Sequence, residues 1–195
     1  FDLVVSRATM ISRADSQLIS LTEDQYRYLD IAEANERTLV CGAAGTGKTL
    51  LALEHARREA AKGRTVLVLC FNRLLGSWLA RETQGEGSGR IAAGTFHGVL
   101  YDIILKSTMG AEFKDKLAAA GPDLYSQTYP LYGELAIAET GAAYDTLVLD
   151  EAQDLLMTHN MSCFNLLVRG GLAGGRWAMF GDFTRQAIFG NSEPG

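Results

Sequence analysis

A run of eight residues has the composition of a phosphate-binding loop. Residues 42–49 read GAAGTGKT and match the pattern GxxxxGK(S/T). Glycine tolerates positive φ, and because it lacks a Cβ atom its amide can approach a phosphate oxygen closely in an anion-binding nest. We expect Lys48 to contact the β- and γ-phosphates of ATP, and the Thr49 hydroxyl to bind Mg²⁺. The candidate nucleotide contacts in this run are Gly42, Gly45, Thr46, Gly47, Lys48 and Thr49.

Two adjacent acids, Asp150 and Glu151, follow the apolar run 147–149. In open α/β sheets, ligands bind beyond the carboxyl ends of the strands. We therefore expect Asp150 to hold the hydration shell of Mg²⁺ and Glu151 to orient or deprotonate an attacking water. The alternative is a pair of acids at a helix N-terminus, where the dipole favours negative charge. The upstream phosphate loop favours the catalytic interpretation, since phosphoryl transfer needs both parts.

Hydrophobic periodicity predicts strands and helices that alternate around these motifs. Thr22 and Gln25 have the spacing of a capping box, which predicts a helix from there to about residue 34. The predicted strands are 38–41, 65–71, 90–93, 146–149 and 177–180, and the predicted helices include 48–62, 74–81 and 96–105. This pattern predicts an α/β fold of the P-loop NTPase (RecA-like) type, with a parallel sheet and helices on both faces. A chance glycine turn at 42–49 is disfavoured, because a strand precedes it and a helix follows.

Composition limits the class of protein. The chain has 195 residues, with 18 Lys and Arg against 23 Asp and Glu, so its formal net charge is −5. This balance disfavours a small, wholly basic nucleic-acid module but leaves room for a local basic groove. No stretch approaches the roughly 18 apolar residues of a membrane span, so we expect no membrane partner. The three cysteines are far apart and form no CxxC pair, which favours a reducing, cytoplasmic location and excludes a zinc ribbon.

We interpret the sequence as one domain cut from a longer protein, because it begins at Phe1 and ends just after a strand-like run. Residues 1–20 read as an extension or linker, and 21–195 as the nucleotide-binding domain. Within it, the segment 106–142 breaks the strand–helix rhythm with glycines and prolines. We expect this segment to be an insertion with two short helices.

Six blocks in order resemble the motifs of one family. They read LTEDQ at 21–25, GAAGTGKT at 42–49, LCFN at 69–72, TFH at 95–97, DEAQD at 150–154, and GD at 181–182 followed by QAIF at 186–189. Together they resemble the Q motif and motifs I, Ia, Ib, II and III of the first RecA-like domain of superfamily 1 helicases of the UvrD/Rep kind. The DExQD form of the fifth block is the most class-specific part.

The resemblance implies a motor that couples ATP hydrolysis to movement on single-stranded DNA, with RNA left open as the strand. Gln25 would hydrogen-bond the adenine edge, and Gln153 and Gln186 would sense the γ-phosphate. Gln186 thereby joins Lys48 and Glu151 as a candidate catalytic residue. The implied nucleic-acid contacts are Phe71, Asn72, Thr95, Phe96 and His97.

The residues alone leave other interpretations of three of these side chains open. The less favoured alternatives are that Gln25 is simply a member of the capping box, Phe71 a core residue of its strand, and His97 a structural histidine. His55 and His159 lie outside every motif, and we expect them to be exposed. We expect Arg57 and Arg58 to form a solvated helix face.

The family works with a second domain. Superfamily 1 enzymes hydrolyse ATP in a cleft between two RecA-like domains, and the second supplies arginines that stabilise transition-state charge. No such segment follows here, so we expect a second RecA-like domain of the same parent chain as partner and little ATPase activity without it. The chain departs from the family at three places. Three residues separate Asp182 from Gln186, and Gly190 and Asn191 stand where the family often has a Trp. The segment 106–142 is short compared with the accessory subdomain that these helicases carry at that point.

Two other functions use the same phosphate chemistry. A P-loop ATPase switch that acts on no nucleic acid is the main alternative, and stimulation of ATPase activity by single-stranded DNA separates it from a motor. A small-molecule kinase is disfavoured, because the chain contains no arginine-rich lid segment.

Overall fold

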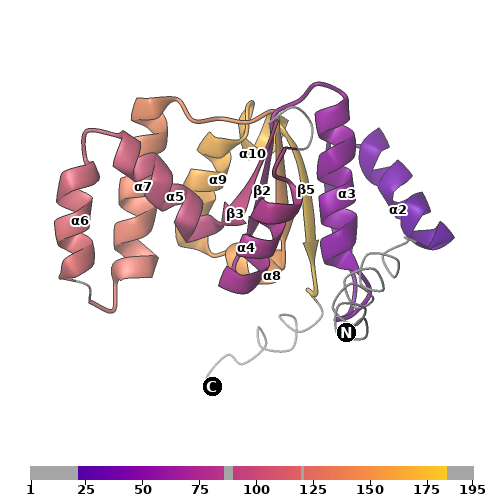
Figure 1. The fold of residues 1–195 in the computed structure, drawn as a ribbon, viewed down its shortest axis with the longest axis horizontal. Helices are drawn as coiled ribbons and strands as arrows, with labels where there is room; N and C mark the ends of the chain where they lie inside the picture. Colours follow the sequence, from indigo (N-terminus) through magenta and orange to yellow (C-terminus); the bar gives the residue numbers. More distant parts are fainter. Residues whose placement is uncertain (1–21, 86–89, 120, 184–195) are drawn as a thin grey trace, which may run out of the picture.

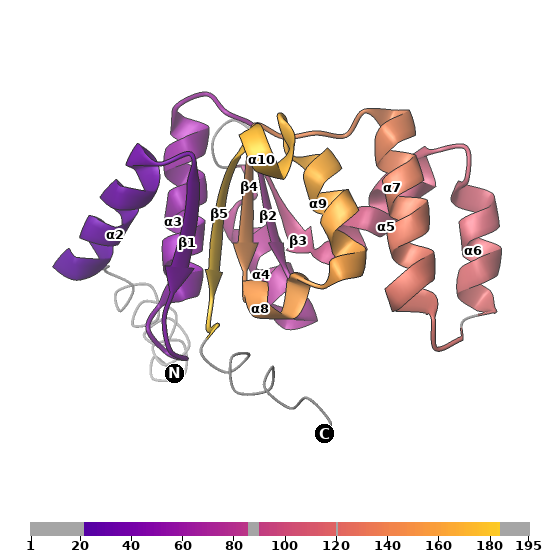
Figure 2. The same cartoon turned by 180° about the vertical axis from the view of Figure 1, so that it is seen from behind.

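The computed structural model describes residues 22–85, 90–119 and 121–183. Five strands form one parallel sheet (Figure 1), and their order is β1-β5-β4-β2-β3, which the labels in Figure 2 follow. They are β1 (Arg37–Cys41), β2 (Val66–Cys70), β3 (Ile91–Thr95), β4 (Thr146–Asp150) and β5 (Arg176–Gly181). The predicted parallel α/β sheet is confirmed. Strand β3 runs beyond the predicted 90–93 because Thr95 still pairs with Cys70.

Helices cover both faces of the sheet, as predicted. The chain places α2 (Glu23–Ala34), α3 (Lys48–Ala61) and α4 (Arg73–Glu82) on one face, and α5 (Phe96–Lys106), α7 (Tyr129–Thr140), α8 (Ala152–Leu155) and α9 (Met161–Leu167) on the other (Figures 1 and 2). Side chains of β2 alternate between the two layers. Val66 and Val68 pack with the first set, and Leu67 and Leu69 with the second. Each such side chain is fully buried, which contributes about 1.5–3 kcal/mol.

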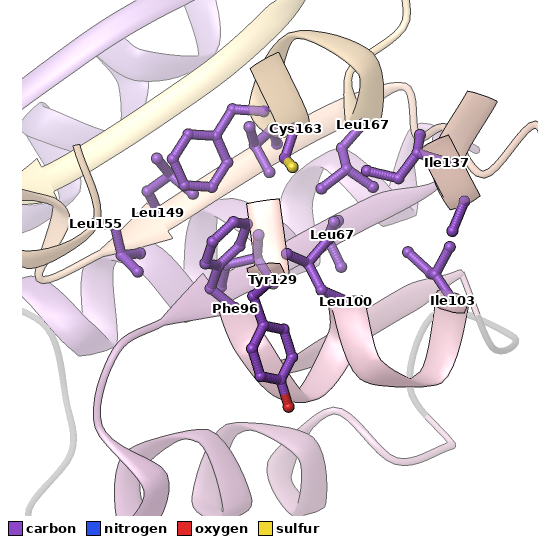
Figure 3. Packing of buried hydrophobic residues seen from close by; sticks show 14 of the residues in the cluster. Leu67, Phe96, Leu100, Ile103, Tyr129, Ile137, Leu149, Leu155, Cys163 and Leu167 are labelled. Atoms are coloured by element: carbon purple, nitrogen blue, oxygen red, sulfur yellow. The ribbon is translucent and has the colours of Figure 1, made fainter. Parts of the chain in front are cut away.

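The segment 106–142 is helical, with α6 (Gly110–Ala118), a π-helical turn at Leu124–Thr128, and α7. Helix α7 belongs to the core and packs between α5 and α9, as the side chains in Figure 3 show. Gly133 permits this approach, since a Cβ there would lie 3.0 Å from both methyl carbons of Leu100. The prediction of two helices is confirmed, and one of them completes the second layer.

The polar face of α3 differs from expectation. His55 is only 1% exposed, so the prediction that it is exposed is wrong, and burial lowers its pKa to about 4. Glu59 is fully buried and accepts hydrogen bonds from Lys62 (3.1 Å) and Arg64 (2.7 Å). Arg58 pairs with acids of α2 instead of forming a solvated face. The reason is that α3 lies between α2 and the sheet, so both of its sides are covered. His159 is exposed, as predicted.

Candidate nucleotide-binding site

The sheet order brings the candidate residues to one edge. The phosphate loop follows β1, and β4 ends at Asp150, the first of the paired acids. Strand β5 lies between those two strands and ends at Gly181, just before Asp182. Because all five strands are parallel, these segments all leave the sheet at its carboxyl edge. The strand order therefore places the loop and the acids on the same side of the fold.

The glycines of the loop are required for two different reasons. Gly45 and Gly47 have φ of 81° and 82°, which side-chain-bearing residues rarely adopt. Gly42 is required for space, since a Cβ there would lie 2.8 Å from Thr46 Oγ1. Helix α3 begins at Lys48, with Gly47 as an N-cap that offers no side-chain hydrogen bond. The first amides of α3 thus lack a side-chain cap, the arrangement in which a helix N-terminus receives an anion.

Lys48 is held across the loop. Its ammonium group donates to the carbonyl oxygens of Gly42 (2.9 Å) and Ala43 (3.0 Å), and the residue is 6% exposed. An ammonium group has three donors, so these two bonds leave one for a phosphate oxygen. Both acceptors are in the loop itself, which keeps the positive charge where phosphates would lie.

Asp150 meets the start of α3 from the end of β4. It is fully buried, and its Oδ1 accepts a hydrogen bond from the backbone of Glu151 (3.0 Å). Burial raises the pKa of Asp150, while the nearby Thr49 hydroxyl and the Lys48 charge act in the opposite direction. Its Oδ2 is buried and makes no hydrogen bond with any described residue.

These groups fit a magnesium ion. Mg²⁺ prefers oxygen ligands and retains several waters, with one or two protein groups and phosphate oxygens completing its shell. The Thr49 hydroxyl and the unpartnered Asp150 Oδ2 are oxygen donors of this kind. The described residues contain no cluster of three or more His, Cys, Asp or Glu that could hold a metal by itself, so such an ion would need the phosphates of a nucleotide as further ligands.

Glu151 is connected to β5 through Gln153. Glu151 has φ 50° and ψ 46°, and it is the one non-glycine residue with positive φ in the described ranges. This conformation costs about 1–2 kcal/mol. Gln153 Nε2 donates to Glu151 Oε2 (2.7 Å), and Gln153 Oε1 accepts from the backbone of Asp182 (3.0 Å). A Cβ at Gly181 would lie 2.7 Å from that same oxygen, so a side chain there would displace the Gln153 amide.

Gln25 has the capping-box role that the sequence left open, and it also contacts the phosphate loop. The capping box is formed, with Gln25 Oε1 accepting from the Thr22 backbone (2.8 Å) and Thr22 Oγ1 accepting from the Gln25 backbone (3.3 Å). Gln25 Nε2 also donates to the carbonyl oxygen of Thr46 in the loop (2.9 Å). The amide therefore connects the start of α2 to the phosphate loop.

The aromatic candidates are divided by burial. Phe71 is 54% exposed, so the interpretation as a core residue is wrong. Phe96 is fully buried, with its ring 4.8 Å from that of Phe164, so the prediction that it contacts nucleic acid is wrong. His97 is half-buried, and its ring lies 6.4 Å from Phe71 and 4.9 Å from Tyr125. Burial, and to a smaller extent the charge of His159, lowers the pKa of His97.

Asn72 and Thr95 are helix caps. Asn72 Oδ1 accepts from the backbones of Leu74 (2.8 Å) and Leu75 (3.1 Å) at the start of α4, and Thr95 Oγ1 accepts from Gly98 (3.1 Å) at the start of α5. These bonds fix both side chains at the carboxyl edge of the sheet. Residues 186–189, including Gln186, lie outside the described residues.

Sequence reasoning missed two tyrosines. Tyr125 stacks on Tyr129 at 5.5 Å and contacts His97, and Tyr28 lines a hollow beside the phosphate loop. Tyr28 follows Gln25 by three residues, which places both on one face of a helix. That spacing was the signal available for Tyr28, whereas no local pattern pointed to Tyr125.

No protein-family model matches the chain, and no curated protein matches it. Within the described residues, no helix is long and apolar enough to cross a membrane.

Proposed function

We propose that this chain is the ATP-binding domain of a helicase or translocase that moves on single-stranded DNA. The observation that carries the proposal is the contact between Thr49 of the phosphate loop and Asp150 at the end of β4. It unites the two parts that phosphoryl transfer needs, an anion-binding loop and a carboxylate able to hold a cation. The order of the motif blocks along the chain supports the motor over other ATPases.

Binding follows from the loop and the acid. The amides of the loop and the N-terminus of α3 hold the phosphates, and Lys48 donates its third N–H to a phosphate oxygen. Thr49 and Asp150 would hold Mg²⁺, with Asp150 deprotonated. When bound, Mg²⁺ neutralises charge that develops on the β- and γ-phosphate oxygens.

Hydrolysis is assigned to Glu151, which positions a water and accepts its proton. Gln153 orients the Glu151 carboxylate through its 2.7 Å bond and also contacts the backbone of Asp182. Loss of the γ-phosphate would alter this chain of bonds and so shift the end of β5. By resemblance to the family, Gln186 and arginines of a second RecA-like domain would complete the site.

The nucleic-acid path is proposed beyond β2 and β3, on the same edge of the sheet as the nucleotide site. The exposed ring of Phe71 offers a face on which a base can stack, a contact that tolerates any base. His97 lies beside it, and Asn72 and Thr95 are held at the adjacent helix starts. The path and the nucleotide site thus share one edge of the sheet, where β2 lies next to β4.

Nucleotide binding is tested with a fluorescent ATP analogue and Mg²⁺. Lys48→Ala should weaken binding about 10- to 150-fold, since hydrogen bonds to charged groups contribute about 1.5–3 kcal/mol. Lys106→Ala, at an exposed position on α5, is the matched control and should bind normally. Equal affinity of the Lys48 variant and the control would refute the assignment of the loop.

Hydrolysis and the motor are tested together in a protein that includes the proposed second RecA-like domain, by single-turnover kinetics with and without a DNA oligonucleotide. Glu151→Gln should slow turnover about 10²- to 10⁴-fold at unchanged ATP affinity, while Asp154→Asn in the same block should not. The oligonucleotide should speed turnover, with an effect that falls steeply as salt rises. Turnover that is insensitive to the oligonucleotide would favour a P-loop switch instead.

A further inference from the structure

A hollow of about 170 Å³ lies between α2 and the phosphate loop. Its lining includes Gln25 and Tyr28 of α2, Val40 of β1, Leu51 of α3, and Gly42 and Thr46 of the loop. Pockets for complete drug-sized ligands measure roughly 300–1,000 Å³, so this hollow suits a single ring system. Since the loop forms one wall, a nucleotide whose phosphates lie on the loop can extend its base into the hollow.

Tyr28 gives this hollow an aromatic wall. Helix α2 packs on the core through Leu29 and Ala32, each 1% exposed, whereas Tyr28 is 55% exposed. The Tyr28 side chain therefore does not contribute to the core, and its ring has a face available to a ligand. Tyr26, 46% exposed on the same helix, is different: the guanidinium of Arg58 lies 5.8 Å from its ring centroid, and it does not line the hollow.

Gln25 leaves one donor and one acceptor for a ligand. A primary amide has two N–H groups and two lone pairs on oxygen. Among described residues, Gln25 donates once, to Thr46, and its side-chain oxygen accepts once, from Thr22. The remaining pair matches an adenine edge, which has an acceptor at N7 and a donor at N6, whereas guanine has acceptors at both N7 and O6.

We propose that Tyr28 is the stacking platform for the nucleobase, an inference that rests on the proposed function. Base affinity then comes from the Tyr28 ring and is shared by adenine and guanine. Phosphate affinity comes from the loop and is independent of Tyr28. The two contributions lie on different elements, so they can be separated by experiment.

The test is isothermal titration of the chain with the Mg²⁺ complexes of ATP, GTP and tripolyphosphate. Stacking of one base on an aromatic ring contributes about 1–3 kcal/mol, so Tyr28→Ala should weaken both nucleotides about 5- to 150-fold. Tripolyphosphate, which has no base, should bind Tyr28→Ala as it binds the unmodified chain. Tyr28→Phe should keep the affinity for ATP, and Tyr26→Ala is the matched control and should also keep it.

Two results would overturn the inference. Unchanged ATP affinity in Tyr28→Ala would show that the ring does not contact the base. An equal loss for ATP and tripolyphosphate would show that Tyr28 acts by shaping the phosphate loop. Failure of the nucleotide-binding assignment on which the inference rests looks different, because the unmodified chain would then bind neither ATP nor tripolyphosphate.

Discussion

Two aspartates at opposite ends of β4 should respond in opposite ways to the same substitution. Asp150 is fully buried, has an oxygen without a partner among described residues, and has its pKa raised by burial. Asp145, just before the strand, accepts from the backbone (2.7 Å) and hydroxyl (2.8 Å) of Thr65 and pairs with Arg169. The Thr65 backbone bond, followed by the Arg169 bond, lowers the pKa of Asp145 to about 2.

The sign of each effect follows from linkage. A folded-state pKa above the unfolded value means that charging Asp150 opposes folding, and that this cost fades as pH falls through the folded pKa. Asp150→Asn should therefore raise the free energy of unfolding at pH 7. Asp145 is the reverse case: its depressed pKa stabilises the fold above pH 3.8, and this contribution is lost as pH falls toward about 2.

The magnitudes can be worked out from the contacts. The fall of the Asp145 pKa from 3.8 to about 2 corresponds to roughly 2.4 kcal/mol. Its side chain is 32% exposed, so solvent screening reduces this to about 1–2 kcal/mol. At position 150, burial of the ionised Asp costs several kcal/mol, whereas burial of the neutral Asn amide costs about 1–3 kcal/mol. Asp150→Asn should therefore raise the free energy of unfolding by about 1–2 kcal/mol.

Urea unfolding at pH 7, followed by tryptophan fluorescence, measures both changes. In a chain of this size, a change of about 1 kcal/mol in the free energy of unfolding shifts Tm by roughly 2–4 °C. Thermal unfolding should therefore show a higher Tm for Asp150→Asn and a lower Tm for Asp145→Asn. Repeating the measurement at pH 3 should shrink the deficit of Asp145→Asn. If Asp150→Asn proved as destabilising as Asp145→Asn, Asp150 would not hold an uncompensated charge. The argument that its Oδ2 is available to bind a cation would then fail.

Three further outcomes follow from the same structure. A thiol reagent should modify Cys41 quickly, but Cys70 and Cys163 only when the chain unfolds. The last two thiols are buried, and burial raises the pKa of each to about 12. Fast modification of all three thiols would contradict this burial. Gly47→Ala should lower the free energy of unfolding by about 1 kcal/mol or more, since φ is 82° and the new Cβ would lie 2.5 Å from the side-chain nitrogen Nε2 of Gln25. An unchanged urea midpoint would contradict the loop geometry. Phe71→Ala should weaken single-stranded DNA about 5- to 150-fold in fluorescence anisotropy, and an unchanged affinity would remove Phe71 from the path.

The sheet and the phosphate loop could be predicted from the sequence because their signals are local. The strand 66–70 is apolar at every position. This pattern indicates a strand that is covered on both faces of the sheet. Gly45 and Gly47 are needed by their own backbone angles, whatever lies around them. Both kinds of signal are fixed by neighbouring residues in the chain.

The errors arose where partners are distant in sequence. His55 and Arg58 look like a solvated face until their tertiary partners are known: His55 lies beside Phe180 of β5, and Arg58 pairs with acids of α2. Phe96 and His97 are adjacent, and the direction in which each points from the first turn of α5 depends on Phe164 and Tyr125, contributed by other elements. Side-chain direction at a motif is thus set by tertiary packing, which a motif pattern does not encode.

The central claim is that the loop and the acids converge on one magnesium-bound triphosphate. A crystal structure of the chain with Mg²⁺ and a non-hydrolysable ATP analogue tests it most directly. We expect the ion at about 2.0–2.1 Å from Thr49 Oγ1 and from phosphate oxygens, with Asp150 in or against its water shell. A triphosphate bound away from residues 42–49, or an ion that does not approach Asp150, would contradict the claim.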